Sequence, residues 1–385
     1  MKNNLFRITL AVAIFALISC VETEEKTTQK DKKFAGAKKI NIVHAKGFRI
    51  EDYKDFLILS VSNPWQGAEN VKYEYVLIKN ETSLPDFAKK LTKIKIPVKR
   101  MVCFSTTHVA SIDFIEETNS IVGISGWKYI NNQKIREKIA NNETIDVGNI
   151  DNMNYELLLS LKPDVVMVYG IEQSVASYVA KLGELNIPVI FNADYLENTP
   201  LGKTEWVKFV AALYDKIDFV SEKFSKIETE YWRECEKIKD TKNNPTVFCN
   251  LPWKETWYVP GGKSYFANLL KDAGAKYLWS ENDSRSAIPL NIESIIESAS
   301  ESDFWINTGM VNSKAEILSI DERLENFKAF RNNKIFNNNA KTNQFGGNDF
   351  WESGFLYPHL ILKDLIQIFH SKTENRELVY YKKVN

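Results

Sequence analysis

The feature that most constrains this chain is a stretch from Lys203 to Asn244 that contains neither glycine nor proline. From Phe219 onward its apolar residues recur at near-helical spacing, and charged residues fill most of the positions between them. This spacing predicts an amphipathic α-helix. A helix of about twenty residues is about 30 Å long, the width of a small domain. Two interpretations stay open: an ordinary core helix of one large domain, or a brace between two lobes.

The rest of the chain favours the brace. A chain of 385 residues usually holds two domains. On the N-terminal side a buried strand, a polar loop and a helix recur, with strands predicted at 97–104, 121–124, 165–168 and 189–192. Such alternation predicts parallel sheets. We therefore expect an α/β fold: two Rossmann-like lobes with mostly parallel sheets, joined by one long α-helix.

The predicted boundaries follow from this pattern. Residues 40–200 form the N-terminal lobe, 201–244 the linker helix region and 245–385 the C-terminal lobe. The first lobe has an extra β-hairpin region at 46–80, where two runs rich in β-branched and aromatic residues, Phe48–Val61 and Val71–Ile78, predict two strands joined by a turn.

The N-terminus predicts export. Lys2 and Arg7 precede an apolar run from Ile8 to Ile18, and Ser19-Cys20 follows. This is a secretory signal pattern, too short to span a bilayer. Residues 1–20 are therefore expected to be a lipoprotein signal peptide, and the polar, charged residues 21–39 a flexible tether.

The candidate ligand contacts lie in loops that follow predicted strands, because ligands of parallel α/β sheets bind beyond the carboxyl ends of the strands. Taken singly, each of these residues is as well explained as a turn or core residue; as a set they predict a cleft. Aromatic residues, 12% of the chain, suit a cleft that grips a large flat or apolar ligand. The candidates are Ser105, Thr106, Thr107, His108, Trp127, Tyr129, Trp253, Trp257, Tyr258, Arg285 and Trp351.

A repeat flanks the central helix. Asn154-Tyr155-Glu156 and Asn291-Ile292-Glu293 each precede an aspartate-led predicted strand that ends near a glycine. In each copy the asparagine can cap a helix and the glutamate lies in the first turn, which the helix dipole favours. Local helix stabilisation explains both glutamates without any function. Two matching units nevertheless favour two similar lobes.

Over about residues 95–370 the chain resembles the substrate-binding lipoproteins of bacterial ABC importers, in the class with one rigid helix between the lobes (class III), whose ligands include ferric siderophores, haem and cobalamin. The resemblance rests on the Ser-Thr-Thr-His run at 105–108, the two Asn-x-Glu units, the long helix and the segment 348–365. Leu17-Ile18-Ser19-Cys20 also resembles the lipobox of such proteins, which implies that Cys20 is lipidated and anchors the protein to a membrane in the cell envelope, facing the periplasm. The chain departs from smaller members by the 46–80 region and by an insertion at 310–345.

The resemblance implies roles for particular residues. Glu156 and Glu293 match the glutamates that dock onto arginine pockets of the permease, and arginine binds a carboxylate bidentately. The partners implied are an ABC permease dimer with its ATPase subunits and a metal chelate as ligand. Arg285, Lys128 and His108 are candidates to meet anionic groups, which favours an iron complex, a ferric siderophore or haem, over cobalamin.

The remaining expectations concern alternatives. Fifty lysines and arginines balance fifty aspartates and glutamates, so no net field attracts nucleic acid. The protein is expected to be a monomer without a cofactor or a resident metal. It is also expected to have no catalytic residues, since no Gly-x-Ser-x-Gly or His-Glu-x-x-His motif occurs. An envelope enzyme and a receptor for a bare metal ion remain the rival functions.

Overall fold

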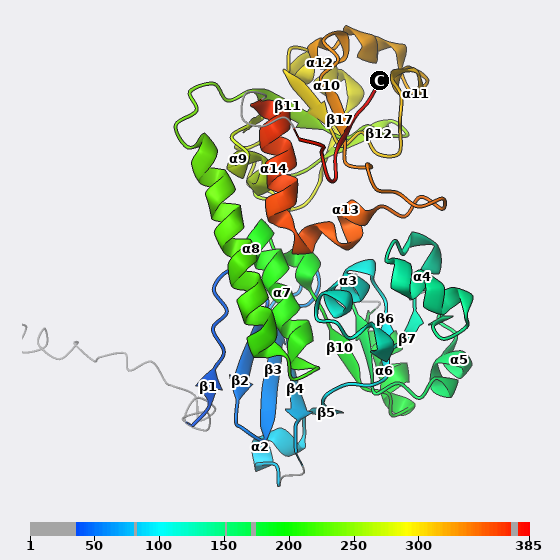
Figure 1. The fold of residues 1–385 in the computed structure, drawn as a ribbon. Coiled ribbons are helices and arrows are strands. Elements are labelled where there is room, and N and C mark those ends of the chain that lie inside the picture. Colours follow the sequence, from blue (N-terminus) through cyan, green and yellow to red (C-terminus); the bar gives the residue numbers. More distant parts are fainter. Residues whose placement is uncertain (1–35, 81–82, 151, 171–174, 371–375) are drawn as a thin grey trace, which may run out of the picture. The chain divides into compact units, whose positions relative to one another are not determined.

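The structure is a computed structural model, and it describes residues 36–80, 83–150, 152–170, 175–370 and 376–385 (Figure 1). The predicted signal peptide, Cys20 and most of the predicted tether lie outside the described residues. The elements below belong to one compact unit, Lys39–Asn385. None of the described helices is both long enough and apolar enough to cross a membrane.

The N-terminal lobe is built on a five-stranded sheet in the order β10-β9-β6-β7-β8, in which every pair is parallel. The sheet comprises β6 (Met101–Cys103), β7 (Ile121–Ile124), β8 (Ile145–Asp146), β9 (Val165–Val168) and β10 (Val189–Phe191). Its helices are α3 (Thr106–Phe114), α4 (Gln133–Ala140), α5 (Tyr155–Ser160) and α6 (Val175–Glu184). Strands β6, β7, β9 and β10 are wholly buried, as expected for a parallel sheet.

The C-terminal lobe repeats this architecture. Its main sheet has the order β14-β11-β16-β17-β18, parallel except for the edge strand β18. The strands of this sheet are β11 (Thr246–Cys249), β14 (Lys276–Tyr277), β16 (Phe304–Ile306), β17 (Ile335–Asn337) and β18 (Lys382–Lys383). A second, smaller antiparallel sheet consists of β12 (Pro252–Trp253), β13 (Thr256–Val259) and β15 (Ile288–Asn291). The helices are α9 (Tyr265–Asp272), α10 (Ile292–Ala299), α11 (Lys314–Leu318), α12 (Lys328–Arg331), α13 (Asp349–Glu352) and α14 (Pro358–Phe369).

A separate sheet precedes the first lobe. The first described strand of this sheet is β1 (Lys38–Lys39), and the sheet continues with β2 (Phe48–Asp52), β3 (Phe56–Ser62), β4 (Lys72–Ile78) and, after α2 (Asp86–Lys89), β5 (Thr92–Lys95). The prediction of one strand over Phe48–Val61 was wrong: the chain turns at Lys54, whose φ is 71°, so the run forms the antiparallel pair β2 and β3. The Asp52 side chain accepts the Lys54 N–H at 2.7 Å and makes this turn without glycine or proline.

The stretch from Lys203 to Asn244 holds most of one helix, which begins earlier at Pro200, and the whole of a second. They are α7 (Pro200–Ala212) and the amphipathic α8 (Ile217–Ile238), which lie side by side in Figure 1. The first half of α8 packs into the N-lobe core through Ile217, Val220 and Ile227. Its second half packs into the C-lobe core through Tyr231 and Ile238. The expected fold class, two α/β lobes braced by one long helix, is therefore confirmed.

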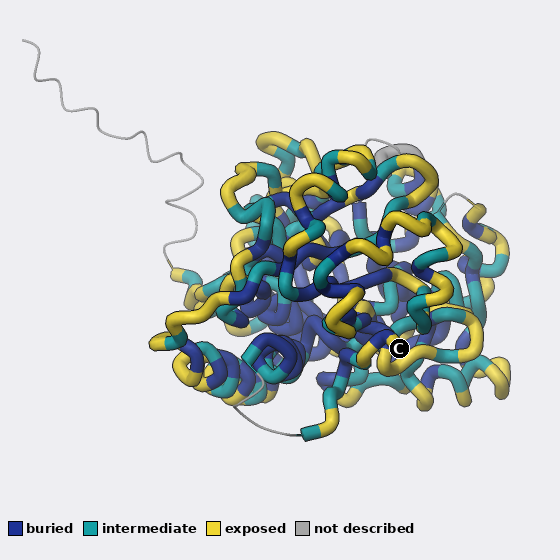
Figure 2. Tube along the Cα trace, turned by 90° about the horizontal axis from the view of Figure 1, so that it is seen from above, coloured by how far each residue is buried: buried dark blue, intermediate teal, exposed yellow. Residues whose placement is uncertain are grey.

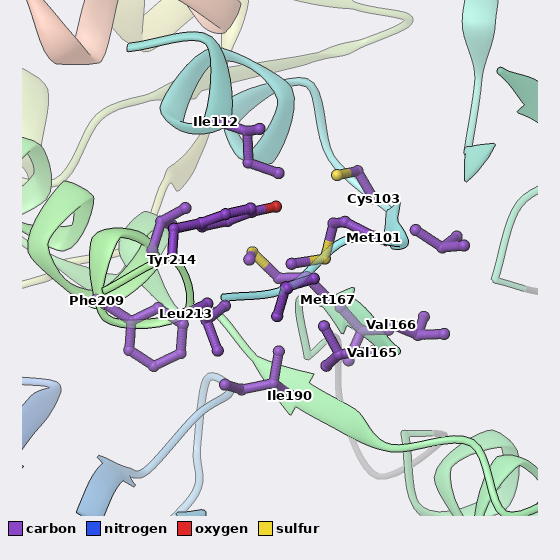
Figure 3. Close-up of a cluster of buried hydrophobic side chains, with 14 of the residues drawn as sticks. Met101, Cys103, Ile112, Val165, Val166, Met167, Ile190, Phe209, Leu213 and Tyr214 are labelled. Atoms are coloured by element: carbon purple, nitrogen blue, oxygen red, sulfur yellow. The ribbon is translucent and has the colours of Figure 1, made fainter. Parts of the chain in front are cut away.

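Buried residues concentrate in the interior of this unit and exposed ones at its periphery (Figure 2). In the N-lobe core, residues of β6, β9 and β10 face Ile112 of α3 and Phe209 and Leu213 at α7 (Figure 3). This packing fixes α3 and α7 against the strands whose ends form the cleft described below.

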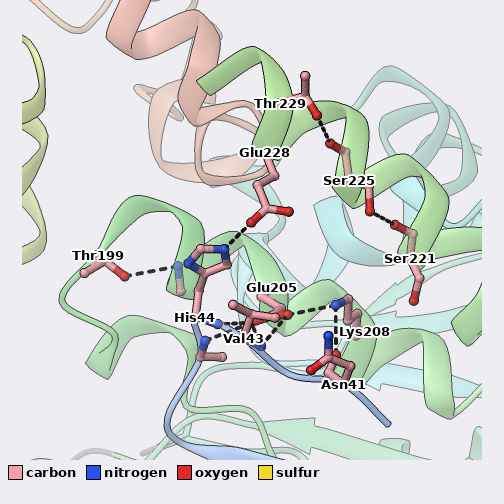
Figure 4. A network of polar contacts seen from close by, with 12 residues as sticks. Asn41, Val43, His44, Thr199, Glu205, Lys208, Ser221, Ser225, Glu228 and Thr229 are labelled. Atoms are coloured by element: carbon pink, nitrogen blue, oxygen red, sulfur yellow. Dashed lines mark hydrogen bonds and ion pairs between the residues drawn. The ribbon is translucent and has the colours of Figure 1, made fainter. Parts of the chain in front are cut away.

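A polar network ties the entering chain to both brace helices (Figure 4). The buried Glu205 carboxylate of α7 accepts backbone N–H groups of Val43, His44 and Ala45 at 2.7 to 3.1 Å and pairs with Lys208 Nζ at 2.7 Å. Burial by itself raises the pKa of Glu205, but the hydrogen bonds from Lys208 and the backbone outweigh it, and the pKa is lowered. His44 also contacts Glu228 of α8 at 2.5 Å.

Candidate functional site

A cleft of about 910 Å³ lies between the two lobes. Its N-lobe wall consists of residues at the ends of strands β6, β7, β8 and β9 and in the loops that follow them, among them Ser105, Ser125, Asp146 and Tyr169. Its C-lobe wall is built in the same way after β11, β16 and β17. Both sheets therefore point their carboxyl ends into one cavity, which is where ligands of parallel α/β folds bind.

The C-lobe wall carries three asparagines that the sequence analysis did not select. Asn250, Asn307 and Asn338 each directly follow a parallel strand and line the cleft. Phe266 of α9 and Met310 add apolar surface. The signal that predicts them is position rather than residue type, because each asparagine is the first residue past a short buried strand.

Exposed apolar side chains gather at the cleft. Tyr129 is 62% exposed, Met310 63% and Trp351 56%, and all three line the cavity. Single exposed aromatic residues are common on protein surfaces, but a group at one cavity marks a binding surface. The arrangement suits stacking on a large ligand.

Four predicted contacts line the cavity: Ser105, Thr106, Tyr129 and Trp351. The predicted Ser-Thr-Thr-His loop is instead a helix start, because the Ser105 Oγ accepts the Thr107 N–H at 3.2 Å and α3 begins at Thr106. This turns Thr107 and His108 into the protein, where they are 9% and 1% exposed. Burial lowers the pKa of His108 to about 3, so its ring is neutral and cannot serve as a cation for an anionic ligand.

The remaining predicted contacts lie outside the cavity lining. Trp253, Trp257 and Tyr258, which were expected in a loop, lie on the hairpin β12–β13. The alternation of β13 buries Trp257, whose Nε1 donates to the Cys249 carbonyl at 2.9 Å. Trp253 and Tyr258 are exposed on this hairpin, and Arg285 is exposed in the 278–287 loop. Trp127 packs edge-to-face on Phe345, with ring centroids 5.0 Å apart.

A segment of the C lobe, residues 341–352, crosses to the N lobe, and we name it the cross-lobe strap (Figure 1). Asn343 Nδ2 donates to the carbonyls of Lys128 and Ile130, both at 2.9 Å. The carboxylate of Glu352 accepts the backbone N–H groups of Asn131 at 2.5 Å and Asn132 at 2.8 Å. The strap thus joins the lobes beside the cleft, and its residues 346–348 and Trp351 line the cavity.

The two predicted docking glutamates lie on different lobes. Asn154 and Asn291 cap α5 and α10 as expected, because their Oδ1 atoms accept backbone N–H groups at 3.0 and 2.7 Å. Glu156 and Glu293 follow in the first turns, and both are exposed. Glu293 forms an ion pair with Arg323, with 3.4 Å between Glu293 Oε1 and Arg323 Nη1. Their docking role stays a prediction.

Metal ligands are not clustered in the described part of the chain: no three His, Cys, Asp or Glu side chains are grouped so that they can hold an ion. The described residues that line the cleft are mostly aromatic, amide and hydroxyl side chains. Such a surface suits an organic ligand that is held by stacking and hydrogen bonds.

Comparison with known proteins agrees with this geometry. Residues 101–342, more than half of the chain, match the sequence profile of the periplasmic binding protein family. A protein of Methanocaldococcus jannaschii named as an uncharacterized lipoprotein is 27% identical over 352 residues, which cover 85% of this chain and 81% of that protein.

Solved structures share the fold at low sequence identity. A periplasmic haem-binding protein of Pseudomonas aeruginosa superimposes with a TM-score of 0.56 at 12% identity, covering 75% of this chain and 98% of that one. The periplasmic vitamin B12-binding protein of Vibrio cholerae gives 0.52 at 12% identity, with 72% and 99% covered. A protein of an ABC-type Fe³⁺-hydroxamate transport system of Saccharomonospora viridis gives 0.51 at 15%, with 72% and 94% covered. The chain therefore belongs to the periplasmic binding protein family, and it has the fold in which one long helix runs between the lobes.

Proposed function

We propose that this protein captures a bulky organic metal chelate outside the cytoplasmic membrane and delivers it to an ABC permease. The chelate is an iron complex, with cobalamin as the alternative. The cleft is the observation that carries this proposal: about 910 Å³, walled by strand ends of both lobes and flanked by Tyr129, Met310 and Trp351. That volume is at the upper end of ordinary ligand pockets, which span about 300–1,000 Å³. The fold neighbours named for haem, vitamin B12 and Fe³⁺-hydroxamate transport support this ligand class.

The role as a receptor explains features that an enzyme does not need. The cavity lies between lobes that each present an exposed glutamate at a helix start, as a protein that docks on a two-subunit pore requires. The relative named as a lipoprotein supports anchoring through Cys20 to a membrane of the cell envelope. We therefore assign the protein no catalytic step of its own.

Tryptophan fluorescence tests the proposal. Trp351 lines the cleft, whereas Trp253 is 71% exposed outside its lining. We expect a ferric siderophore, haemin or cobalamin to quench the fluorescence of the full-length chain in detergent. Trp351→Phe should remove much of that quench, and the matched control Trp253→Phe should keep it.

A chain that binds none of the three chelates in equilibrium dialysis would overturn the proposed ligand class. Quenching that survives in Trp351→Phe and disappears in Trp253→Phe would place the ligand outside the cleft.

A further inference from the structure

The extra sheet before the N lobe carries a turn that reaches the cleft. Strands β3 and β4 pair with Ser62 opposite Lys72, and residues 63–71 connect them; we name this segment the β3–β4 turn. Asn63 closes it, because its N–H donates to the Val71 carbonyl at 2.8 Å and its Oδ1 accepts the Val71 N–H at 3.1 Å. The turn lies outside residues 101–342, the part of the chain that matches the family profile.

The β3–β4 turn packs on the N-lobe wall of the cleft. Gly170 follows Tyr169, which lines the cavity just past the end of β9. A Cβ atom on Gly170 would lie 2.9 Å from Trp65 Cβ and 3.0 Å from the Pro64 carbonyl oxygen, so only glycine lets the two segments approach this closely. Trp65 also packs edge-to-face on Phe191 at the end of β10, with ring centroids 5.9 Å apart. The turn therefore supports the wall at β9 and β10.

Tyr195 connects the turn to Tyr169. Its hydroxyl donates to the Gly170 carbonyl, and the Gln66 backbone is hydrogen-bonded to the same hydroxyl. Its ring meets the Tyr169 ring edge-on, with centroids 6.4 Å apart and an angle of 77° between the planes. Such edge-to-face pairs favour a defined ring orientation. Tyr169 is thus held through its neighbour Gly170 and through Tyr195, and both of these contact the turn.

The tip of the turn also contacts the other lobe. Gln66 Nε2 donates to Ser286 Oγ at 2.8 Å. The Ser286 carbonyl accepts the Gly261 N–H at 3.1 Å, and Gly261 follows Pro260, which lines the cleft on the C-lobe side. The turn therefore lies between the two walls of the cleft and fixes the position of the wall at β9 relative to the C lobe.

Two aromatic side chains of the N lobe flank the centre of its wall. Tyr129 follows β7 and Tyr169 follows β9, and β6 lies between these strands in the sheet. A ligand wide enough to reach across β6 can contact both rings. Tyr129 is 62% exposed, whereas Tyr169 is partly buried against Tyr195. A side chain that is already held loses less conformational freedom when a ligand binds, so Tyr169 is the better preorganised of the two.

We propose that Tyr169 is a ligand contact of the cleft and that the β3–β4 turn positions it, acting through Trp65 and Tyr195. This inference rests on the proposed function and gives the extra sheet a part in ligand recognition. Trp65 does not line the cleft, so it influences binding only through the wall that it supports.

A double-mutant cycle tests the inference on the full-length chain in detergent. The probe is whichever of a ferric trihydroxamate complex, haemin and cyanocobalamin binds most tightly in equilibrium dialysis. We expect Tyr169→Ala to weaken binding by about tenfold and Tyr169→Phe by less than about threefold, because phenylalanine keeps the ring. Trp65→Ala should weaken binding by about threefold or more in the wild type, and by less than about 1.5-fold in a protein that already carries Tyr169→Ala.

The outcomes separate a positioning role from a general loss of structure. An unchanged affinity of Tyr169→Ala would refute the ligand contact, and an undiminished effect of Trp65→Ala in the Tyr169→Ala protein would refute the positioning. Trp232→Ala, which changes an exposed tryptophan of α8, is the matched control and should bind as the wild type does.

A milder variant keeps the test decisive if Trp65→Ala does not fold. Tyr195→Phe removes only the hydroxyl that donates to Gly170, and it should weaken binding by about twofold or more in the wild type and not in the Tyr169→Ala protein. A wild type that binds none of the three probes would overturn the receptor function and this inference together. Additive losses in a protein that binds would overturn this inference alone.

Discussion

Glu352 of the cross-lobe strap makes the stability of this protein depend on pH in a direction that can be worked out. Its side chain is 2% exposed, and its two carboxylate oxygens accept the N–H groups of Asn131 and Asn132, which immediately precede α4. Burial raises the pKa of Glu352 from 4.5 to about 7, although the two backbone hydrogen bonds lower it in part. The folded protein therefore keeps this proton at pH values where the unfolded chain has lost it.

The sign follows from proton linkage. Between pH 4.5 and about 7 the folded state binds the extra proton, so the free energy of unfolding falls as pH rises through this window. At about 1.4 kcal/mol for each pH unit, the full effect is about 3 kcal/mol. The stabilisation is complete below pH 4.5 and is lost above about pH 7. Glu352→Gln removes the titrating group, so this part of the pH dependence should disappear.

Urea unfolding followed by circular dichroism at pH 5, 6, 7 and 8 measures the effect. The variant should also be less stable than the wild type at pH 5 by about 1–3 kcal/mol, because its amide nitrogen faces one of the two N–H donors. Glu297→Gln, which changes an exposed glutamate of α10, is the matched control and should keep the wild-type slope. A Glu352→Gln protein with the same slope as the wild type would refute the assignment of this titration to the strap.

Two further predictions concern the partners. Reversing both Glu156 and Glu293 to arginine should lower affinity for the permease by at least about tenfold and stop uptake into vesicles. Chelate affinity, measured by dialysis, should stay unchanged, and a loss of it would refute the docking role. Cys20→Ser should move the protein from the membrane fraction to the soluble fraction on cell fractionation, since a lipid chain contributes about 0.8 kcal/mol of membrane affinity for each buried methylene; a variant that still carries lipid would contradict the lipobox prediction.

Buried parallel strands were predictable because their sequences are short, continuous runs without charged or polar residues. The observed β7 and β9 have the bounds expected at 121–124 and 165–168. The break between α7 and α8 was not predictable from composition, because no glycine or proline marks it. Asp215 takes a φ of 56°, and the Val98 N–H donates to the Leu213 carbonyl at 2.9 Å. The end of α7 is therefore set by a tertiary contact, which local sequence does not encode.

The site was predicted in position more than in residue identity. The ends of parallel strands could be located from the sequence, so Ser105, Thr106 and Tyr129 were placed correctly at the cavity. Aromatic density was a poor guide, because Trp257 alternates inward on β13 and fills the C-lobe core. Which residues of a loop line a cavity depends on backbone geometry.

The connections between the lobes also limit how the cleft can open. The brace helix α8 contributes side chains to the cores of both lobes, so bending it requires disturbing two packed interiors. The cross-lobe strap adds a second connection, in which Asn343 and Glu352 hold the backbone from Lys128 to Asn132. Trp127 and Phe345 pack together at the same place. Because two connections join the lobes, we expect cargo to enter through small local movements of the strap rather than a wide rotation of one lobe.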